Sequence, residues 1–493
     1  MSRLNKEIMS SNGPFVSLHN HSEQGSPLDG FSKLDSLFDR AKELGQSAIA
    51  ITEHGTCASA YDSYKESIRT GVKLIPGIEA YFTPDFKEKK SSHMVLLPRN
   101  ENGYKNILRL NYEAYKHQST AFGKMIPRIS WNDIESYGSD VFCLTACSNG
   151  LLAKDIVSDD FSKAESNILR LQKIFSDRLY LEIQPHALKT DDGKVDQVKL
   201  NEKLIEYSSK FGIPFVTTCD AHYVRQSDSK YHDMMLSVRD GKALSDPYRF
   251  KYGVQEMYLK DHTEMTGFFG SDISTIAMRN SMIISDACEM PHYLKSRGAI
   301  LPKFPVADQS DYVEFDIWWK KYCDELPEDK AYLRYHCTLG FEEFTDGFSI
   351  EKKREYWDRV KYELSVLELH NFSSYMLIVA DYVEWANSHQ VIAGPGRGSV
   401  NGSLVAYLLK ITKTDSIKYD LPFERFHNKQ KKAFPDIDCD FSHPARVQAY
   451  IKEKYGADHV AQISNWACMT PKVVLKDVAR SLEIGGDKAM AFK

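Results

Sequence analysis

Short apolar runs alternate with longer amphipathic stretches over about the first 220 residues, enough for several strand–helix units. Between the runs, SKLDSLFDRAKELG (32–45) and VKLNEKLIEYSSKFG (198–212) have helical spacing and end in glycine, which commonly terminates a helix. The alternation predicts an α/β domain, either a barrel or a doubly wound sheet. The runs that predict strands are FVSLHNH (15–21), SAIAIT (47–52), LIPGIEAYFT (74–83), HMVLLP (93–98), VFCLTAC (141–147), LYLEIQ (179–184) and PFVTTCDAHY (214–223).

Polar residues that bind metals lie at or near the ends of these predicted strands. Because the carboxyl ends of barrel strands meet at one mouth, we expect these side chains to converge. Imidazole, carboxylate and thiolate groups that converge would form a transition-metal site. A single His-x-His pair would be weak evidence, but the whole set is unlike a coincidence. The set is His19, His21, Asp29, His54, Glu79, His93, Cys147, Asp220 and His222.

Composition narrows the class of protein without identifying it. The 493 residues favour two to four domains, and 42% of them are hydrophobic, which is enough for large cores. The net charge of −5 shows no basic excess, although a basic groove can be offset by acids elsewhere. Nine scattered cysteines without a CxxC pair favour a reducing compartment. With no signal-peptide pattern and no apolar run of about 18 residues, we expect a cytoplasmic protein with no membrane partner.

A glycine-rich turn marks the second half of the chain. The stretch YMLIVADYVEWANSH (375–389) has helical spacing and leads into QVIAGPGRGSVNGSLVAYLLKIT (390–412), where a short strand, a turn and a helix are predicted. Such a turn either cradles phosphate with its N–H groups or is simply tight. It matches neither the P-loop nor GxGxxG spacing. Arg397 and Ser399 favour phosphate, because a guanidinium and a hydroxyl are natural partners of a triphosphate.

The segment FPDIDCDF (434–441) has an aspartate at every second position. In a strand, Asp436, Asp438 and Asp440 would share one face, where like charges repel. The segment is therefore either a solvated strand face or a site for Mg²⁺, which favours carboxylate and phosphate oxygens.

The order of HNH, LDG, EHG, GIEAY, HMVLLPRN and CDAHY resembles the polymerase and histidinol phosphatase (PHP) domain. The resemblance implies a seven-stranded distorted barrel, a cluster of Zn²⁺, Mn²⁺ or Fe ions bound by the nine residues of the set above, and 3′–5′ exonuclease activity that proofreads in cis. The family usually has aspartate at position 53 and asparagine at position 219, where this chain has Glu53 and Cys219. Both changes are expected to act on ligands indirectly.

The second half resembles the palm of C-family replicative DNA polymerases, the family of bacterial DNA polymerase III alpha subunits. The resemblance is carried by GPGRGS, GSLVAYLLKIT, KYDLPFERF, PDIDCDF, KYGADHVAQI and LKDVAR, in that order. It implies that Asp436 and Asp438 are catalytic and hold Mg²⁺, while Asp440 is structural. It also implies primer–template DNA and dNTPs as substrates. The triphosphate loop would comprise Gly396, Arg397, Gly398 and Ser399.

The same resemblance predicts a domain order and an incomplete polymerase site. We expect a PHP domain over 1–285, an α+β palm segment over 286–467 and the start of a helical thumb over 468–493. The family's third palm carboxylate, its fingers and the rest of its thumb would come from a C-terminal polymerase fragment, which could also contact a sliding clamp. The resemblance implies that the protein acts in the cytoplasm of a bacterial cell or of a phage-infected host.

Two alternatives remain open from the sequence. The chain could be a non-catalytic scaffold that keeps structural metal, or a small-molecule phosphoesterase of the histidinol phosphatase kind. The phosphoesterase alternative gives no reason for GPGRGS followed by PDIDCDF.

Overall fold

The computed structural model describes residues 15–121, 124–190, 195–295, 300–431, 434–463, 465 and 467–485. The chain divides into two compact units. Unit 1 comprises Met1–Ser296 together with Trp466–Lys493, and unit 2 comprises Arg297–Asn465. The predicted boundary at 285/286 lies inside a helix of unit 1, and the stretch from 468 onward groups with unit 1.

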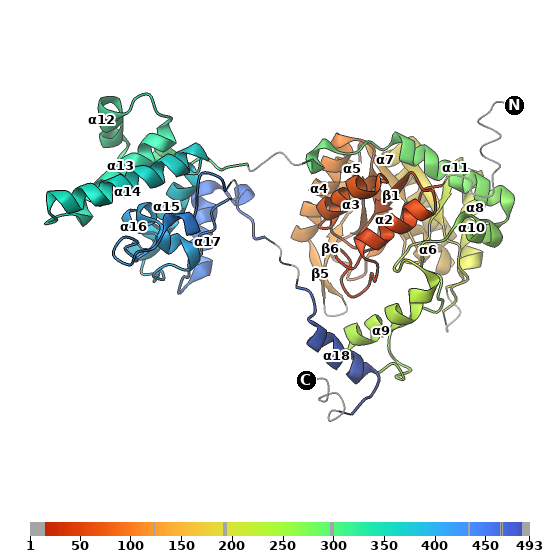
Figure 1. The fold of residues 1–493 in the computed structure, drawn as a ribbon. Coiled ribbons are helices and arrows are strands. Elements are labelled where there is room, and N and C mark those ends of the chain that lie inside the picture. The colour runs from red at the N-terminus through yellow and green to blue at the C-terminus, as the bar shows by residue number, and fades with distance from the viewer. Residues whose placement is uncertain are drawn as a thin grey trace. The chain divides into compact units, whose positions relative to one another are not determined.

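Unit 1 is built on β-strands with helices packed around them (Figure 1). Seven strands form one sheet in the order β5-β6-β3-β4-β7-β8-β9, and β1 pairs with β2 in parallel. The strands are β1 (Ala48–Ile51), β2 (Lys73–Pro76), β3 (Ile78–Phe82), β4 (Ser92–Pro98), β5 (Gln118–Ala121), β6 (Lys124–Ile129), β7 (Val141–Leu144), β8 (Leu179–Ile183) and β9 (Phe215–Thr217).

Isolated parallel bridges join the two sheets into a ring. Asn20 pairs with Ala221 beyond β9, Ser17 pairs with Ile49 in β1, and His54 pairs with Glu79 in β3. The segment 15–21 therefore lies between β9 and β1, and β1 leads back to β3. This closure confirms the predicted distorted α/β barrel, although segment 15–21 pairs through single bridges rather than as a regular strand. The β5–β6 hairpin was not predicted.

The helices of unit 1 cover the strands and bury their apolar side chains. For example, α4 packs on β4 and β6, and α11 packs on β9. The helices are α2 (Leu34–Glu43), α3 (Ala60–Thr70), α4 (Glu101–Lys116), α5 (Trp131–Tyr137), α6 (Leu151–Val157), α7 (Phe161–Phe175), α8 (Gln197–Phe211), α9 (Ser229–Asp240), α10 (His262–Phe269), α11 (Ser271–Ala287) and α18 (Pro471–Ser481). The predicted helices at 32–45 and 198–212 correspond to α2 and α8.

Unit 2 is almost entirely helical, and its core is formed by facing aromatic and aliphatic side chains. Its helices are α12 (Tyr312–Tyr322), α13 (Glu328–Phe344), α14 (Ile350–Leu369), α15 (Ser373–Ser388), α16 (Leu404–Leu408) and α17 (Pro444–Tyr455). The strands predicted within 390–412 and 434–441 are not regular strands. Ala393 and Phe441 form one antiparallel bridge. The pairing of the two segments extends over only a few residues. In the described part of this unit, no third strand lies beside them to support a longer ladder.

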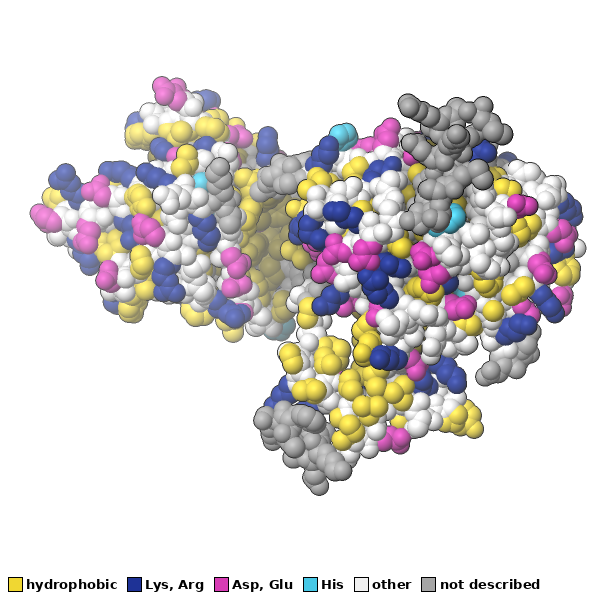
Figure 2. All heavy atoms as spheres, turned by 45° about the vertical axis from the view of Figure 1, so that its right-hand side comes forward, with side chains coloured by type: hydrophobic (Ala, Val, Ile, Leu, Met, Phe, Trp, Pro, Cys, Tyr) yellow, Lys and Arg dark blue, Asp and Glu magenta, His cyan; other side chains and the backbone are white. Residues whose placement is uncertain are grey.

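The molecular surface carries both signs of charge. On the face shown in Figure 2, basic and acidic side chains are interspersed over the protein, in keeping with the small net charge. Within the described residues, no helix combines the length and the apolar composition that crossing a bilayer would require.

Candidate metal centre and palm motifs

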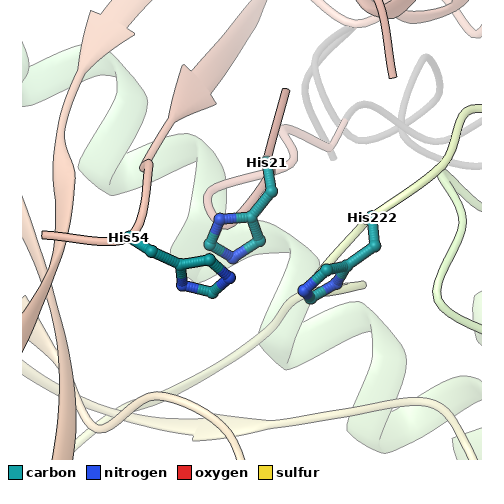
Figure 3. A group of neighbouring side chains, drawn as sticks. All are labelled: His21, His54 and His222. Carbon is teal, nitrogen blue, oxygen red and sulfur yellow. The ribbon is translucent and has the colours of Figure 1, made fainter. Parts of the chain in front are cut away.

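All nine predicted metal ligands of unit 1 lie in one connected cluster, which we call the metal centre. Three groups within it have ligand atoms within 4.8 Å of one another, the arrangement that a metal ion needs. The first group, His21, His54 and His222, is drawn in Figure 3, where the three imidazole rings converge from separate segments. The other two groups are His19, His21 and Asp220, and Glu79, His93 and Cys147.

Glu79 lies at the middle of the metal centre. Its Oε2 is 2.5 Å from His54 Nδ1, and its Oε1 is 2.7 Å from His93 Nδ1 and 3.4 Å from His19 Nε2. The side chain is buried, and its position on β3 follows from the bridge between His54 and Glu79. One carboxylate therefore contacts three histidines from three different segments, as expected of a group that bridges metal ions.

Asp220 and Asp29 connect the remaining ligands. Asp220 Oδ1 is 3.1 Å from His21 Nε2 and 3.3 Å from His19 Nε2. Asp29 Oδ2 is 3.0 Å from His54 Nε2 and 3.9 Å from His222 Nε2. Although Asp29 belongs to none of the three groups above, it closes the cluster on the side of His54 and His222.

The backbone around three ligands adopts the left-handed conformation that side chains rarely take. Leu28 precedes Asp29 with φ 60°, Ala146 precedes Cys147 with φ 61°, and Asp220 itself has φ 46°. Residues held in such conformations cost of order 1–3 kcal/mol and cluster at functional sites. These backbone conformations therefore lower the stability of the fold while they orient three of the predicted ligands.

Burial and neighbouring charges give the histidines opposite proton affinities. Burial opposes the charged form of His19, but the carboxylates of Asp220 and Glu182 outweigh it and hold its pKa well above the usual value. Burial and the neighbouring His54 lower the pKa of His21 to about 3. Burial, together with Asp220 and Glu79, raises the pKa of the Cys147 thiol well above its usual value. Without a cation, the thiol stays protonated.

The donor set fits a cluster of divalent transition metals. Imidazole, carboxylate and thiolate together suit Zn²⁺, Mn²⁺ or Fe rather than Mg²⁺ or Ca²⁺, which prefer oxygen alone. Glu79 and Asp220 are buried and Asp29 is half-buried, so their carboxylates concentrate negative charge, which divalent cations would neutralise. The Nδ1–H of His222 donates to the Asp220 carbonyl over 2.8 Å, which leaves Nε2 available to a metal.

The sequence did not reveal Glu182, which orients a ligand. Its Oε1 accepts from His19 Nδ1 at 2.7 Å and from the Thr218 hydroxyl at 2.5 Å, and the side chain is fully buried. A carboxylate that fixes the far nitrogen of a ligating histidine aims the other nitrogen at the metal. A glutamate inside the apolar strand LYLEIQ was the available signal, because such a residue is almost never buried without a partner.

The two positions at which the chain departs from the PHP pattern behave differently. Glu53 is buried and accepts hydrogen bonds from the hydroxyls of Ser22, Ser26 and Ser59. The Ser26 hydroxyl lies 3.3 Å from His21 Nδ1, so Glu53 acts on that ligand through one serine. Cys219 is buried with its sulfur 3.7 Å from the Met265 sulfur, on the side of the hydrophobic core.

In unit 2, the glycine loop (394–399) and the aspartate segment (434–441) lie side by side. Gly394 N–H donates to the Asp440 carbonyl over 2.9 Å, and the Gly398 backbone faces the Asp438 carboxylate. Gly396 and Gly398 have φ 103° and 66°, which favours glycine at both. The structure thus places the predicted triphosphate loop, Gly396, Arg397, Gly398 and Ser399, beside the predicted catalytic Asp438, whereas no hydrogen bond or ion pair joins the loop to Asp436 among the described residues.

The predicted alternation of the aspartate segment is present without a regular strand. Asp436, Asp438 and Asp440 are exposed, whereas Ile437 and Cys439 are half-buried against the core of unit 2. Arg397 NH1 lies 3.2 Å from Asp440 Oδ1, and both side chains are largely exposed. The arginine predicted to bind triphosphate is thus paired with the aspartate predicted to be structural.

A buried carboxylate that was not predicted holds the chain behind the glycine loop. Glu363 is 0% exposed and accepts from the Leu404 and Val405 N–H groups and from the Ser403 hydroxyl, at 2.8 to 3.0 Å. Arg359 Nε donates to its Oε1 over 2.7 Å. Glu363 therefore fixes the start of α16 and, with it, the end of the loop.

Comparison with protein families gives each half of the chain a match. Residues 17–186, which form most of the barrel, match the PHP domain. Residues 331–492 match the family described as the bacterial DNA polymerase III alpha NTPase domain.

Curated relatives extend the match to nearly the whole chain. DNA polymerase III subunit alpha of Borreliella burgdorferi is 36% identical over 97% of this chain, and that of Aquifex aeolicus is 32% identical over 95%. The chain covers 39% and 40% of these relatives, so it spans about two fifths of their length. Over nearly its whole length the chain is therefore similar to a part of DNA polymerase III alpha subunits. A solved amidohydrolase structure from Chromobacterium violaceum is 14% identical over 42% of this chain and 87% of that chain, with a TM-score of 0.26, too low to establish a shared fold.

Proposed function

We propose that this chain is part of a replicative DNA polymerase and supplies both a metal-dependent 3′–5′ exonuclease and the first half of the polymerase site. The observation that carries the exonuclease is the convergence of nine ligand candidates in the metal centre. Under this proposal, unit 1 contains the PHP domain and the start of the thumb, and unit 2 contains the palm segment.

The exonuclease reaction would be phosphodiester hydrolysis at a DNA 3′ end. Bound divalent ions would supply Lewis acidity toward the phosphate and lower the pKa of water. His19, His21, His54, His93 and His222 would bind through ring nitrogens, and Glu79 and Asp220 would bridge. Glu182 would hold His19 in the ligating orientation, because it accepts from the opposite ring nitrogen. Water adds to phosphorus, the P–O3′ bond breaks, and a nucleoside 5′-monophosphate and a new 3′-hydroxyl form.

The polymerase reaction would use the exposed aspartates of unit 2. Asp436 and Asp438 would hold Mg²⁺, which would supply the charge that activates a primer 3′-hydroxyl and clamps a dNTP. The N–H groups of Gly396, Gly398 and Ser399 would contact the triphosphate, and Arg397 would exchange Asp440 for a phosphate. The third carboxylate, the fingers and any contact with a sliding clamp would come from polypeptide corresponding to the remaining three fifths of the relatives.

A primer-length assay tests this proposal. The chain is mixed with a 5′-labelled primer–template, Mn²⁺ or Zn²⁺ and dNTPs, beside a His19→Ala/His21→Ala variant. We expect the native chain to shorten the primer, the variant to leave it intact, and neither to extend it. Metal-dependent extension by this chain alone would contradict the proposed need for a further polymerase fragment. An unchanged primer would favour a scaffold role, and hydrolysis of histidinol phosphate without any action on DNA would favour a small-molecule phosphoesterase.

A further inference from the structure

Aromatic side chains lead from the metal centre to the protein surface. Phe31 follows ligand Asp29 by two residues, and its N–H donates to the carbonyl of ligand His222 over 2.6 Å. Its ring lies parallel to that of Tyr231 in α9, with the centroids 6.3 Å apart and the planes at 22°. Tyr231 is 53% exposed. One aromatic ring of this pair is therefore about half exposed to solvent.

A second aromatic pair lies against the same ligand. The Tyr252 hydroxyl is 3.2 Å from His222 Nε2, and the two ring centroids are 5.3 Å apart. Phe250 packs on Tyr252 with the centroids 5.3 Å apart and the planes at 77°, and it is 48% exposed. Phe31 and Tyr252 are anchored on the buried Tyr223–Met257–Tyr258 cluster. The pair thus has a rigid inner side and an exposed outer side.

Two cations accompany these rings. Lys230 Nζ is 4.8 Å from the Tyr231 ring centroid, and the Arg239 guanidinium is 5.0 Å from that of Phe250. Arg239 NH1 also lies 2.8 Å from Asp29 Oδ1, so it joins the aromatic residues to the metal centre. Aromatic faces interleaved with basic groups are the features that bind single-stranded nucleic acid, because bases stack on the rings while phosphates meet the cations.

A purely structural role would account for only part of this arrangement. Packing on the buried cluster explains the inner faces of Phe31 and Tyr252. It does not explain why Tyr231 and Phe250 leave half of their side chains in water beside a hydrolytic centre. A substrate with planar apolar groups and negative charges complements both the rings and the cations.

We propose that Phe31, Tyr231, Phe250 and Tyr252 form a base-stacking site that selects unpaired, single-stranded DNA 3′ ends. The proposal rests on the exonuclease proposed above and names the residues that would hold its substrate. The last bases stack on Tyr231 and Phe31, and the terminal phosphodiester reaches the metal centre. A paired 3′ end presents its bases already stacked and therefore binds more weakly.

A fluorescence titration tests this site without requiring turnover. The probe is a short single-stranded DNA with 2-aminopurine as its 3′-terminal base and a phosphorothioate at the last linkage, mixed with the chain and Mn²⁺. Stacking quenches 2-aminopurine, so we expect strong quenching at the 3′ end and little when the base is moved to the 5′ end. Tyr231→Ala is expected to weaken binding about tenfold, since stacking of one base contributes about 1–3 kcal/mol.

Matched variants separate stacking from folding. Phe31→Leu keeps apolar packing and removes the aromatic face, so it should also weaken binding. Tyr322→Ala is the control, because Tyr322 is 60% exposed with Lys321 Nζ 4.7 Å from its ring centroid, yet it lies on α12 in unit 2. Equal quenching at both ends, or unchanged affinity in Tyr231→Ala and Phe31→Leu, would overturn the stacking site.

The two proposals can fail independently. If the native chain binds and quenches the 3′ probe but never shortens a primer, the stacking site stands and the exonuclease is wrong. If the chain shortens primers while Tyr231→Ala and Phe31→Leu cut single strands with native KM, the exonuclease stands and the stacking site is wrong.

Discussion

The metal centre of unit 1 and the aspartates of unit 2 place carboxylates in opposite surroundings. Glu79 is 1% exposed and contacts several imidazoles, whereas Asp436 and Asp438 are exposed. Burying a carboxylate is unfavourable unless it is paired, so unit 1 must supply its own partners. Exposed aspartates remain solvated until a cation and a phosphate arrive. The carboxylates of the first site are paired within one unit, whereas those of Asp436 and Asp438 are exposed to solvent.

The largest effect is expected from a substitution of Glu79, in the middle of the metal centre. Glu79→Gln keeps the shape of the side chain but removes the charge that bridges His54 and His93. We expect bound metal to fall and exonuclease activity to drop at least about a hundredfold. Transition metal per chain, measured by elemental analysis after dialysis, checks this, with Asp436→Asn as a control that should retain the native transition-metal content. Native metal content in Glu79→Gln would contradict the assigned role.

The second prediction concerns the buried carboxylate of unit 2. Glu363→Ala leaves two backbone N–H groups and the Ser403 hydroxyl without their acceptor and removes the carboxylate that pairs with Arg359 Nε. We expect the free energy of unfolding of unit 2 to fall by about 3 kcal/mol, and by less for Glu363→Gln, which keeps an acceptor. Urea unfolding followed by tryptophan fluorescence measures this, since Trp318, Trp319, Trp357 and Trp385 lie in unit 2. If Glu363→Ala and the native chain unfold with the same free energy, Glu363 does not stabilise unit 2.

The third prediction uses a buried histidine remote from both sites' ligands. Burial, with His370 and Lys431 nearby, lowers the pKa of His427 to about 4, and neither ring nitrogen has a hydrogen-bond partner among the described residues. Protonation therefore favours the unfolded chain. The contribution of neutral His427 to the free energy of unfolding is fully present above pH 6.5 and is lost as the pH falls toward 4. The loss amounts to about 1–2 kcal/mol at pH 5.

Urea unfolding at pH 7 and pH 5 checks this loss. His427→Phe should unfold with a smaller difference between the two pH values than the native chain, and the exposed His389→Gln should match the native difference. An unchanged difference in His427→Phe would count against His427 as the source.

The smallest effect is expected at the exposed aspartates. Asp438→Asn should change stability by less than about 0.5 kcal/mol and leave primer shortening unaffected, because the side chain is exposed in unit 2. With a complementary polymerase fragment added, the same variant should abolish primer extension. Primer-length gels on the native and Asp438→Asn chains measure both. Loss of shortening in Asp438→Asn would show that the two sites are not independent.

The strand–helix pattern predicted an α/β domain, and the resemblance to the PHP family implied the barrel. The nine candidate ligands could be listed because strand ends and polar residue types are local features. It did not predict that segment 15–21 pairs through single bridges, or that the aspartate segment lacks a regular strand, because both depend on which distant segments lie alongside. Glu182 and Glu363 were also missed. Glu182 contacts His19 and Glu363 contacts Ser403, each more than 30 residues away along the chain. Neither glutamate lies in a recognisable motif.

The close approach of Glu53 to Gly25 limits how this chain can evolve. A Cβ at position 25 would lie 2.2 Å from Glu53 Cγ, so the glutamate fits only because residue 25 has no side chain. A shorter acid at position 53 would not relieve this contact, because aspartate keeps a Cγ. Among descendants of this sequence, a residue other than glycine at position 25 should therefore occur only together with a change at position 53 that removes or moves this Cγ.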